Sequence, residues 1–155
     1  MTWKEYVTWS STRGYFVEGL SGAQYIREDA YVGVMHELEH PADKIVWLAA
    51  PDPNQVWGKI LPYISDRQFT SVPGTAVALK KGIPIAVFER KGHTLRIFDE
   101  NVCTETLVAF AEAFKKRNIF PALHRITVKQ FPDTATQALS NAGFVKAMLD
   151  FVLYR

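Results

Sequence analysis

The amino-acid sequence predicts a single α+β domain built on a largely antiparallel sheet or a partly closed barrel, with a central three-stranded meander and about three helices. Its length of 155 residues is typical of one domain and allows a substantial core. Between residues 75 and 98, three apolar segments alternate with short turns that contain glycine. Residues 28–39, 105–117 and 133–141 instead carry helical periodicity or helix-end signals. Strands therefore dominate, and helices connect some of them.

The meander is predicted from strands at Thr75–Leu79, Ile83–Phe88 and Thr94–Phe98. Two three-residue loops, Lys80–Gly82 and Arg90–Gly92, would join them, each with glycine at the third position, where a left-handed residue is favoured. Loops with an odd number of residues place the aliphatic side chains of all three strands on one face. That face would consist of Val77, Leu79, Ile85, Val87, Leu95 and Ile97.

The opposite face of the meander would carry Phe88, Arg96 and Phe98 among small residues. Rings and a guanidinium on one face can stack on bases and contact phosphates. Alternatively, Phe88 and Phe98 pack beneath the amphipathic helix predicted at Glu105–Arg117, and the small alanines of this face suit such close packing. We favour packing over base contact for these two rings.

Turn signals divide the rest of the chain. Short strands at Tyr15–Val17 and Ala23–Ile26 predict an N-terminal hairpin. A helix should follow at Glu28–Glu39, with Pro41 at its end. Further strands are expected at Lys44–Ala50, at Arg125–Gln130 and, as one or two strands, at Phe144–Tyr154, with a long irregular segment at Pro51–Gly74. An irregular segment of that length is either functional or packed by its own side chains.

Composition and charge exclude several classes of protein. The formal charge of +2 is too small to indicate a dedicated nucleic-acid binder by itself. No segment is apolar enough to span a membrane and the N-terminus lacks a signal-peptide core, so a cytoplasmic protein is expected. Cys103 is the single cysteine, which excludes an internal disulfide, and we expect a structural thiol rather than a nucleophile. Phosphate-binding glycine motifs do not occur, and no cofactor is expected.

The segment His36-Glu37-Leu38-Glu39-His40 matches the H-E-x-x-H pattern of zinc hydrolases. On a helix, His36 and His40 would share a face and could hold zinc, with Glu37 as general base. The charge of Glu39 and the proline directly after His40 do not suit a buried helical site. The following strand also offers no third ligand. An exposed, charged helix end is therefore the preferred interpretation, and a zinc hydrolase is the less favoured alternative.

Several blocks of the chain resemble the C-terminal, DEAD/H-associated domain of the Lhr (large helicase-related) family of superfamily 2 helicases. The blocks are Arg13–Tyr25, Leu48–Asn54 with Gly58 and Leu61-Pro62, Gly74–Phe98, and Arg125-Ile126 to Ala142-Gly143-Phe144. Their order is that of the family, and together they cover about residues 13 to 155. The sequence departs from the family pattern at Val56-Trp57, Tyr63-Ile64, Val72 and Lys91.

The resemblance implies a non-catalytic accessory domain of, or derived from, an ATP-dependent DNA or RNA helicase. Such a domain would brace the motor and winged-helix domains and guide single-stranded nucleic acid, and residues 1–27 would lead in from the winged-helix domain. The motor motifs are not in this sequence, so we expect neither ATPase nor unwinding activity. If the strand is contacted, the candidate residues are Arg13, Tyr15, Gln24, Trp57, Arg90 and Arg96. A structural docking module without nucleic-acid contact is the alternative.

Overall fold

The computed structural model describes residues 11–14 and 22–155, with side chains from residue 22 onward. The helices are α2 (Glu28–Glu39), α3 (Cys103–Lys115) and α4 (Thr136–Asn141). The strands are β1 (Ser11–Gly14), β2 (Gln24–Arg27), β3 (Ile45–Ala49), β4 (Ala76–Lys80), β5 (Ile83–Glu89), β6 (Thr94–Ile97), β7 (Arg125–Val128), β8 (Val145–Ala147) and β9 (Asp150–Tyr154). They form antiparallel sheets in the orders β1-β2, β3-β4-β5-β6 and β7-β9-β8. The α+β class and the meander are confirmed, and none of these sheets closes into a barrel.

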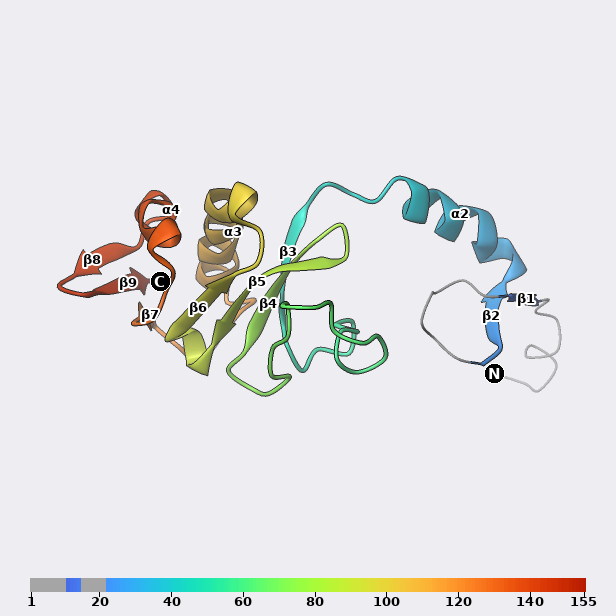
Figure 1. The fold of residues 1–155 in the computed structure, drawn as a ribbon, viewed down its shortest axis with the longest axis horizontal. Coiled ribbons are helices and arrows are strands. Elements are labelled where there is room, and N and C mark those ends of the chain that lie inside the picture. The colour runs from blue at the N-terminus through green and yellow to red at the C-terminus, as the bar shows by residue number, and fades with distance from the viewer. Residues whose placement is uncertain (1–10, 15–21) are drawn as a thin grey trace.

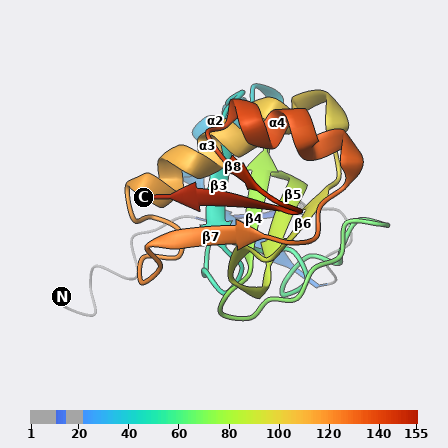
Figure 2. The same ribbon diagram turned by 90° about the vertical axis from the view of Figure 1, so that its left-hand side faces the viewer.

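Helix α3 packs between the two larger sheets, with α4 beside it (Figures 1 and 2). Its buried face includes Leu107, Phe110 and Phe114. The ring centroid of Phe110 lies 4.2 Å from the ring centroid of Phe88 on β5. Trp47 on β3 donates its indole N–H to the carbonyl of Thr106 at 2.9 Å. Phe88 therefore packs under the helix, as we favoured from the sequence.

Both turns of the meander differ from the prediction. Lys80 pairs with Ile83, so Lys81 and Gly82 form a two-residue turn, and a β-bulge at Ile85 shifts the register within the ladder. Glu89 pairs with Thr94, which leaves the four residues 90–93 between β5 and β6. An even number of turn residues reverses the face of each following side chain unless a bulge compensates. The bulge keeps Val87 on the face of Val77 but leaves Ile85 on the side of α3, contrary to the prediction, and the β5–β6 ladder has no such bulge.

As a result, the predicted faces of β6 are wrong. Leu95 pairs with Phe88 and lies on its face, in the core beneath α3. Arg96 pairs with Val87, and Phe98 packs with Val77 and Val87 on the opposite face. Phe98 therefore does not pack under the helix, and Arg96 does not share a face with Phe88.

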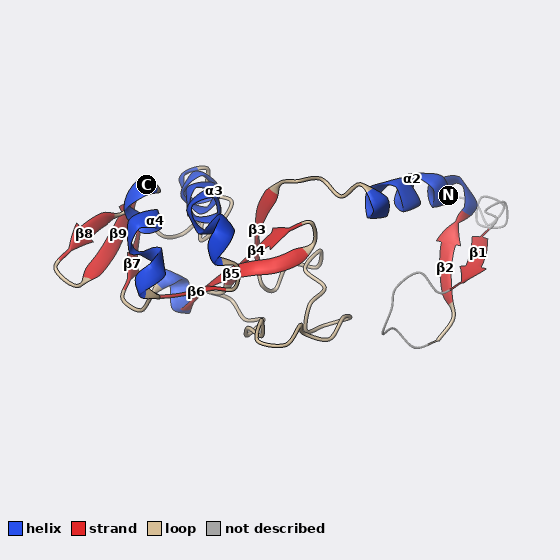
Figure 3. Cartoon of the chain, turned by 45° about the horizontal axis from the view of Figure 1, so that its top comes forward, coloured by secondary structure: helices blue, strands red, loops and turns tan. Residues whose placement is uncertain are grey.

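The irregular segment between β3 and β4 covers the face of the central sheet that α3 leaves open. Phe69 is buried there against Val77 and Val87, and Trp57 and Tyr63 pack around them. The hydroxyl of Tyr63 donates to the carbonyl of Phe69 at 2.5 Å. In Figure 3 this segment is the long tan loop on the side of the sheet away from α3. The segment is thus packed by its own side chains, which leaves neither face of the sheet open.

A short parallel bridge between Thr94 and Gln130 joins the two larger sheets. The amide of Leu95 donates to the carbonyl of Gln130 at 2.8 Å, and the carbonyl of His93 accepts from Lys129 and Gln130. The buried core consequently runs without a break from Trp47 to Leu153. The two sheets and their helices form one folding unit, which we call the body (residues 44–155).

The N-terminal elements β1, β2 and α2 form an arm that lies apart from the body in Figure 1. Helix α2 has the predicted bounds, but it buries none of its residues. Strand β1, which was not predicted, pairs antiparallel with β2, and the strand predicted at Tyr15–Val17 lies outside the described residues. Within the described part of the chain, no helix has the length and apolar character that a membrane span requires.

Candidate nucleic-acid interface

The candidate residues of the N-terminal hairpin belong to the arm. Arg13 lies in β1 opposite Tyr25, and Gln24 lies in β2 opposite Gly14. Tyr15 lies outside the described residues. Because the arm lies apart from the body, Arg13 and Gln24 are separated from the candidates in the body (Figure 1).

Trp57 lies at the end of the central sheet where β4 turns into β5. Its indole N–H donates to the carbonyl of Gly82 at 2.9 Å. Its ring is half-buried against the cluster of Ala50, Phe69 and Val87. The side chain thereby attaches the irregular segment to the β4–β5 turn, which gives it a structural role.

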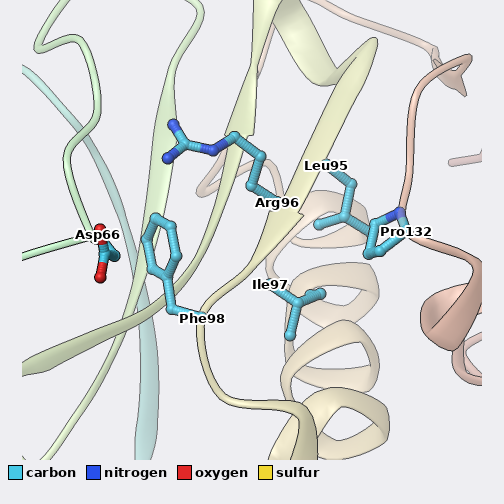
Figure 4. A pocket seen from close by; sticks show the side chains of 6 residues that line it. All are labelled: Asp66, Leu95, Arg96, Ile97, Phe98 and Pro132. Carbon is cyan, nitrogen blue, oxygen red and sulfur yellow. The ribbon is translucent and has the colours of Figure 1, made fainter.

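Arg96 lies above the ring of Phe98 on the face that the irregular segment covers. Its guanidinium carbon is 5.2 Å from the ring centroid, within the range of a cation–π contact. The guanidinium donates to the carbonyl of Gln68 at 2.9 Å and lies 3.7 Å from a carboxylate oxygen of Glu89. Figure 4 shows Arg96 and Phe98 at a hollow of about 350 Å³, which Asp66 and Pro132 also line. Arg96 is 41% exposed, so part of its charge remains available to a ligand.

Arg90 and Lys91 project from a turn whose backbone is unusually constrained. Arg90, Lys91 and Gly92 all have positive φ, at 52°, 58° and 91°. The amide of Lys91 donates to the carbonyl of Gly74 at 2.7 Å. Both side chains are exposed. Left-handed conformations cost non-glycine residues free energy, so the surrounding structure must hold the backbone from which these two cations project.

The structure brings only part of the predicted site together. Arg90 directly follows Glu89 in the chain, and the carboxylate of Glu89 lies 3.7 Å from the guanidinium of Arg96. Trp57 is at the other end of β5, because its partner Gly82 precedes that strand. The five candidates that the structure describes therefore fall in three places: Arg13 and Gln24 in the arm, Trp57 at the β4–β5 turn, and Arg90 and Arg96 beside Glu89.

A second hollow, of about 400 Å³, lies beside the β4–β5 turn and was not predicted from the sequence. Its lining includes Ile64, Arg67, Lys80, Lys81, Ile83, Ile85 and Asp99. Arg67 donates to the carbonyl of Pro84 at 2.7 Å. The ammonium of Lys80 lies 3.4 Å from Asp43 and 3.8 Å from Glu105. Arg67 belongs to a segment without periodicity, so the sequence held no signal that would place it there.

His36 and His40 lie next to each other in the last turn of α2. Their ring centroids are 4.8 Å apart, and Nδ1 of His40 is 3.3 Å from the carbonyl oxygen of His36. Both residues are exposed, as an exposed helix end requires. Among the residues that the structure describes, no group of three histidine, cysteine or acidic side chains is arranged to hold a metal ion.

Cys103 is the first residue of α3 and is buried in the main core. Burial raises the pKa of its thiol, and the negative charge of Glu100 acts in the same direction. A nucleophilic cysteine requires the opposite shift, since the thiolate is the reactive form.

Acidic residues gather in α2 and the four residues that follow it, whereas basic residues are in excess in the body. Residues 28–43 contain five acidic residues and no lysine or arginine. Residues 44–155 contain fifteen lysines and arginines against nine acidic residues. The small net charge of the whole chain therefore conceals an acidic helix joined to a basic body.

A scan against models of protein families finds no family that matches this chain, and a search of curated proteins finds no matching relative.

Proposed function

We propose that this protein is a non-catalytic accessory domain of, or derived from, an ATP-dependent helicase of the Lhr type. It would brace the motor and winged-helix domains and guide single-stranded DNA or RNA along the body. The observation that carries the nucleic-acid part is the excess of positive charge on residues 44–155, which the acidic segment 28–43 conceals in the whole chain. A basic surface attracts the phosphate backbone irrespective of base sequence.

The surface around Glu89 is the part of the body best suited to such contacts. Arg90 and Lys91 are exposed and their backbone is held by the hydrogen bond to Gly74. Phosphate contacts from lysine and arginine position a strand without reading its sequence. The neighbouring Arg96 is half-exposed above Phe98 and could contact the next phosphate or a base.

This role is tested by the fluorescence anisotropy of a labelled single-stranded oligonucleotide, titrated with the protein at low and moderate salt. We expect saturable binding that weakens steeply with salt, because each phosphate contact releases counterions. Arg90→Glu should weaken binding by about tenfold and lower the slope of log affinity against log salt by about 0.7 for each phosphate that is no longer neutralised. Lys146→Glu is the matched control, since Lys146 is also exposed but lies on β8.

Absence of binding at low salt would exclude strand guidance by this chain. An equal reduction of affinity in Arg90→Glu and Lys146→Glu would show that the attraction is spread over the body rather than placed at the β5–β6 turn. If no binding occurs at low salt, docking to another protein surface becomes the proposed function.

A docking module without nucleic-acid contact is the second candidate, and helix α2 favours it. Val34 and Leu38 of α2 are 40% and 60% exposed, and the helix buries no residue. An amphipathic helix normally owes its stability to an apolar face that is packed against something. The helix is thus suited to contact another polypeptide surface.

A further inference from the structure

We propose that α2 of one copy docks in the hollow beside the β4–β5 turn of a second copy, so that two chains exchange their N-terminal arms. This inference concerns self-association and does not depend on the helicase role or on nucleic-acid binding. The apolar side of α2 would contact the basic body of another copy of this chain.

The helix offers an apolar stripe flanked by acids. Val34, Met35 and Leu38 follow the spacing of one helical face, and Val34 and Leu38 are 40% and 60% exposed. Glu37 and Glu39 lie in the last turn of the same helix, and Asp43 follows in the linker. A surface complementary to this helix needs apolar contact area and positive charge.

The hollow of about 400 Å³ supplies both properties. Three isoleucines line it, and one of them, Ile83, is 44% exposed. Arg67, Lys80 and Lys81 also line it, against a single acidic side chain, Asp99. Glu105 faces Lys80 from α3. Asp43 of the chain's own linker is a second carboxylate beside Lys80, so Arg67 and Lys81 are the cations of this hollow that can meet the acids of an incoming helix.

The linker directs α2 away from its own hollow. Pro41 restricts His40, whose backbone is non-helical, and the Asp43–Lys80 ion pair attaches the linker to the body at its root. The arm consequently extends outward (Figure 1). Ile45, the first residue of β3, pairs with Lys80, so the root of the arm and the hollow are adjacent. Two copies with these ends facing each other can exchange arms about a two-fold axis, and each would use the same surface.

Disulfide cross-linking between two single-cysteine chains tests the exchange. In a Cys103→Ala background, one chain carries Leu38→Cys and the other, with a larger tag, carries Ile83→Cys. We expect a mixed disulfide dimer at least tenfold more abundant than with a partner carrying Met148→Cys. Met148 is the matched control because it is 93% exposed and lies in the distant β8–β9 turn.

Cross-linking of Leu38→Cys to Ile83→Cys no better than to Met148→Cys would overturn the proposal. So would a disulfide that forms in a chain carrying both cysteines without an increase in mass, because α2 would then dock on its own body. Sedimentation of the unmodified protein must agree, with a dimer that dissociates on dilution.

The electrostatic part of the interface is tested by reversing charges on one side at a time. Glu37→Lys with Glu39→Lys, and separately Lys81→Glu, should each weaken the dimer by about tenfold. An equimolar mixture of the two variants should recover association, because the reversed arm then meets the reversed hollow. Failure of the mixture to associate would exclude this pairing. The same samples can be titrated with oligonucleotide, so dimerisation and nucleic-acid binding are scored independently.

Discussion

At the scale of single residues, two glycines with the same backbone conformation have different surroundings. Gly92 and Gly143 have φ values of 91° and 90°. A Cβ on Gly92 would lie 2.5 Å from a side-chain carbon of Ile126, whereas a Cβ on Gly143 would meet nothing within 4 Å. Gly92 therefore permits the close approach of the β5–β6 turn to β7, and Gly143 serves only the turn after α4.

We expect Gly143→Ala to cost about 1 kcal/mol of unfolding free energy, which is the cost of a left-handed alanine. Gly92→Ala should cost about 1–3 kcal/mol more, because Ile126 is buried and must be displaced. Urea denaturation of both variants measures the difference. Equal destabilisation would mean that the contact with Ile126 relaxes without cost.

Cys103 provides a prediction about pH. Burial raises the pKa of its thiol above that of an unfolded cysteine, so the folded protein keeps the proton at pH values where the unfolded chain loses it. The associated stability is complete below the ordinary thiol pKa and is lost as pH rises through and above it. The urea midpoint of the protein should therefore fall more steeply at alkaline pH than that of Cys103→Ala. Parallel curves for the two proteins would contradict this assignment.

Residue-level predictions from sequence fail where they depend on counting turn residues. Three-residue loops satisfy the alternation and predict Arg96 on the face of Phe88. The ladder instead leaves residues 90–93 between the strands, which moves Arg96 to the face of Val87. A sequence pattern cannot distinguish a three-residue turn from a four-residue one when the added residue, His93, fits either.

At the scale of elements, helices were predicted better than irregular segments. The bounds of α2 were correct, and α3 begins and ends two residues earlier than expected. The segment between β3 and β4 could be recognised as irregular, but its partners could not be identified. Trp57, Tyr63 and Arg67 each bond to a backbone carbonyl, and such bonds leave no periodic trace in a sequence.

Trp57→Phe separates the structural role of this ring from a contact with nucleic acid. The variant keeps an aromatic ring but loses the hydrogen bond to Gly82, which should lower the unfolding free energy by about 1 kcal/mol. Oligonucleotide affinity, measured well below the melting temperature, should remain unchanged. A reduced affinity at unchanged stability would instead place Trp57 in the nucleic-acid interface.

At the scale of the whole molecule, the sequence was sufficient for the α+β class and for the order of the elements from β2 onward, but not for the separation of the acidic and basic segments in space. A net charge of +2 argued against strong nucleic-acid binding until the fold separated residues 28–43 from the body. The placement of the arm could not be predicted, because the stripe of Val34 and Leu38 is that of any helix packed on a core. The hollow beside the β4–β5 turn likewise depends on residues far apart in the chain.

The bridge between Thr94 and Gln130 ties the two larger sheets together, so the protein should not tolerate a truncation between them. A cut after β6 would appear natural, because one sheet ends there. It would remove α3 and leave Phe88 and Leu95 uncovered, so the fragment should be recovered as aggregate. A cut between Asp43 and Lys44 crosses no β-ladder of the described strands and gives up the ion pair of Lys80 with Asp43. Residues 44–155 are accordingly the smallest piece that we expect to crystallise or to give a dispersed NMR spectrum on its own.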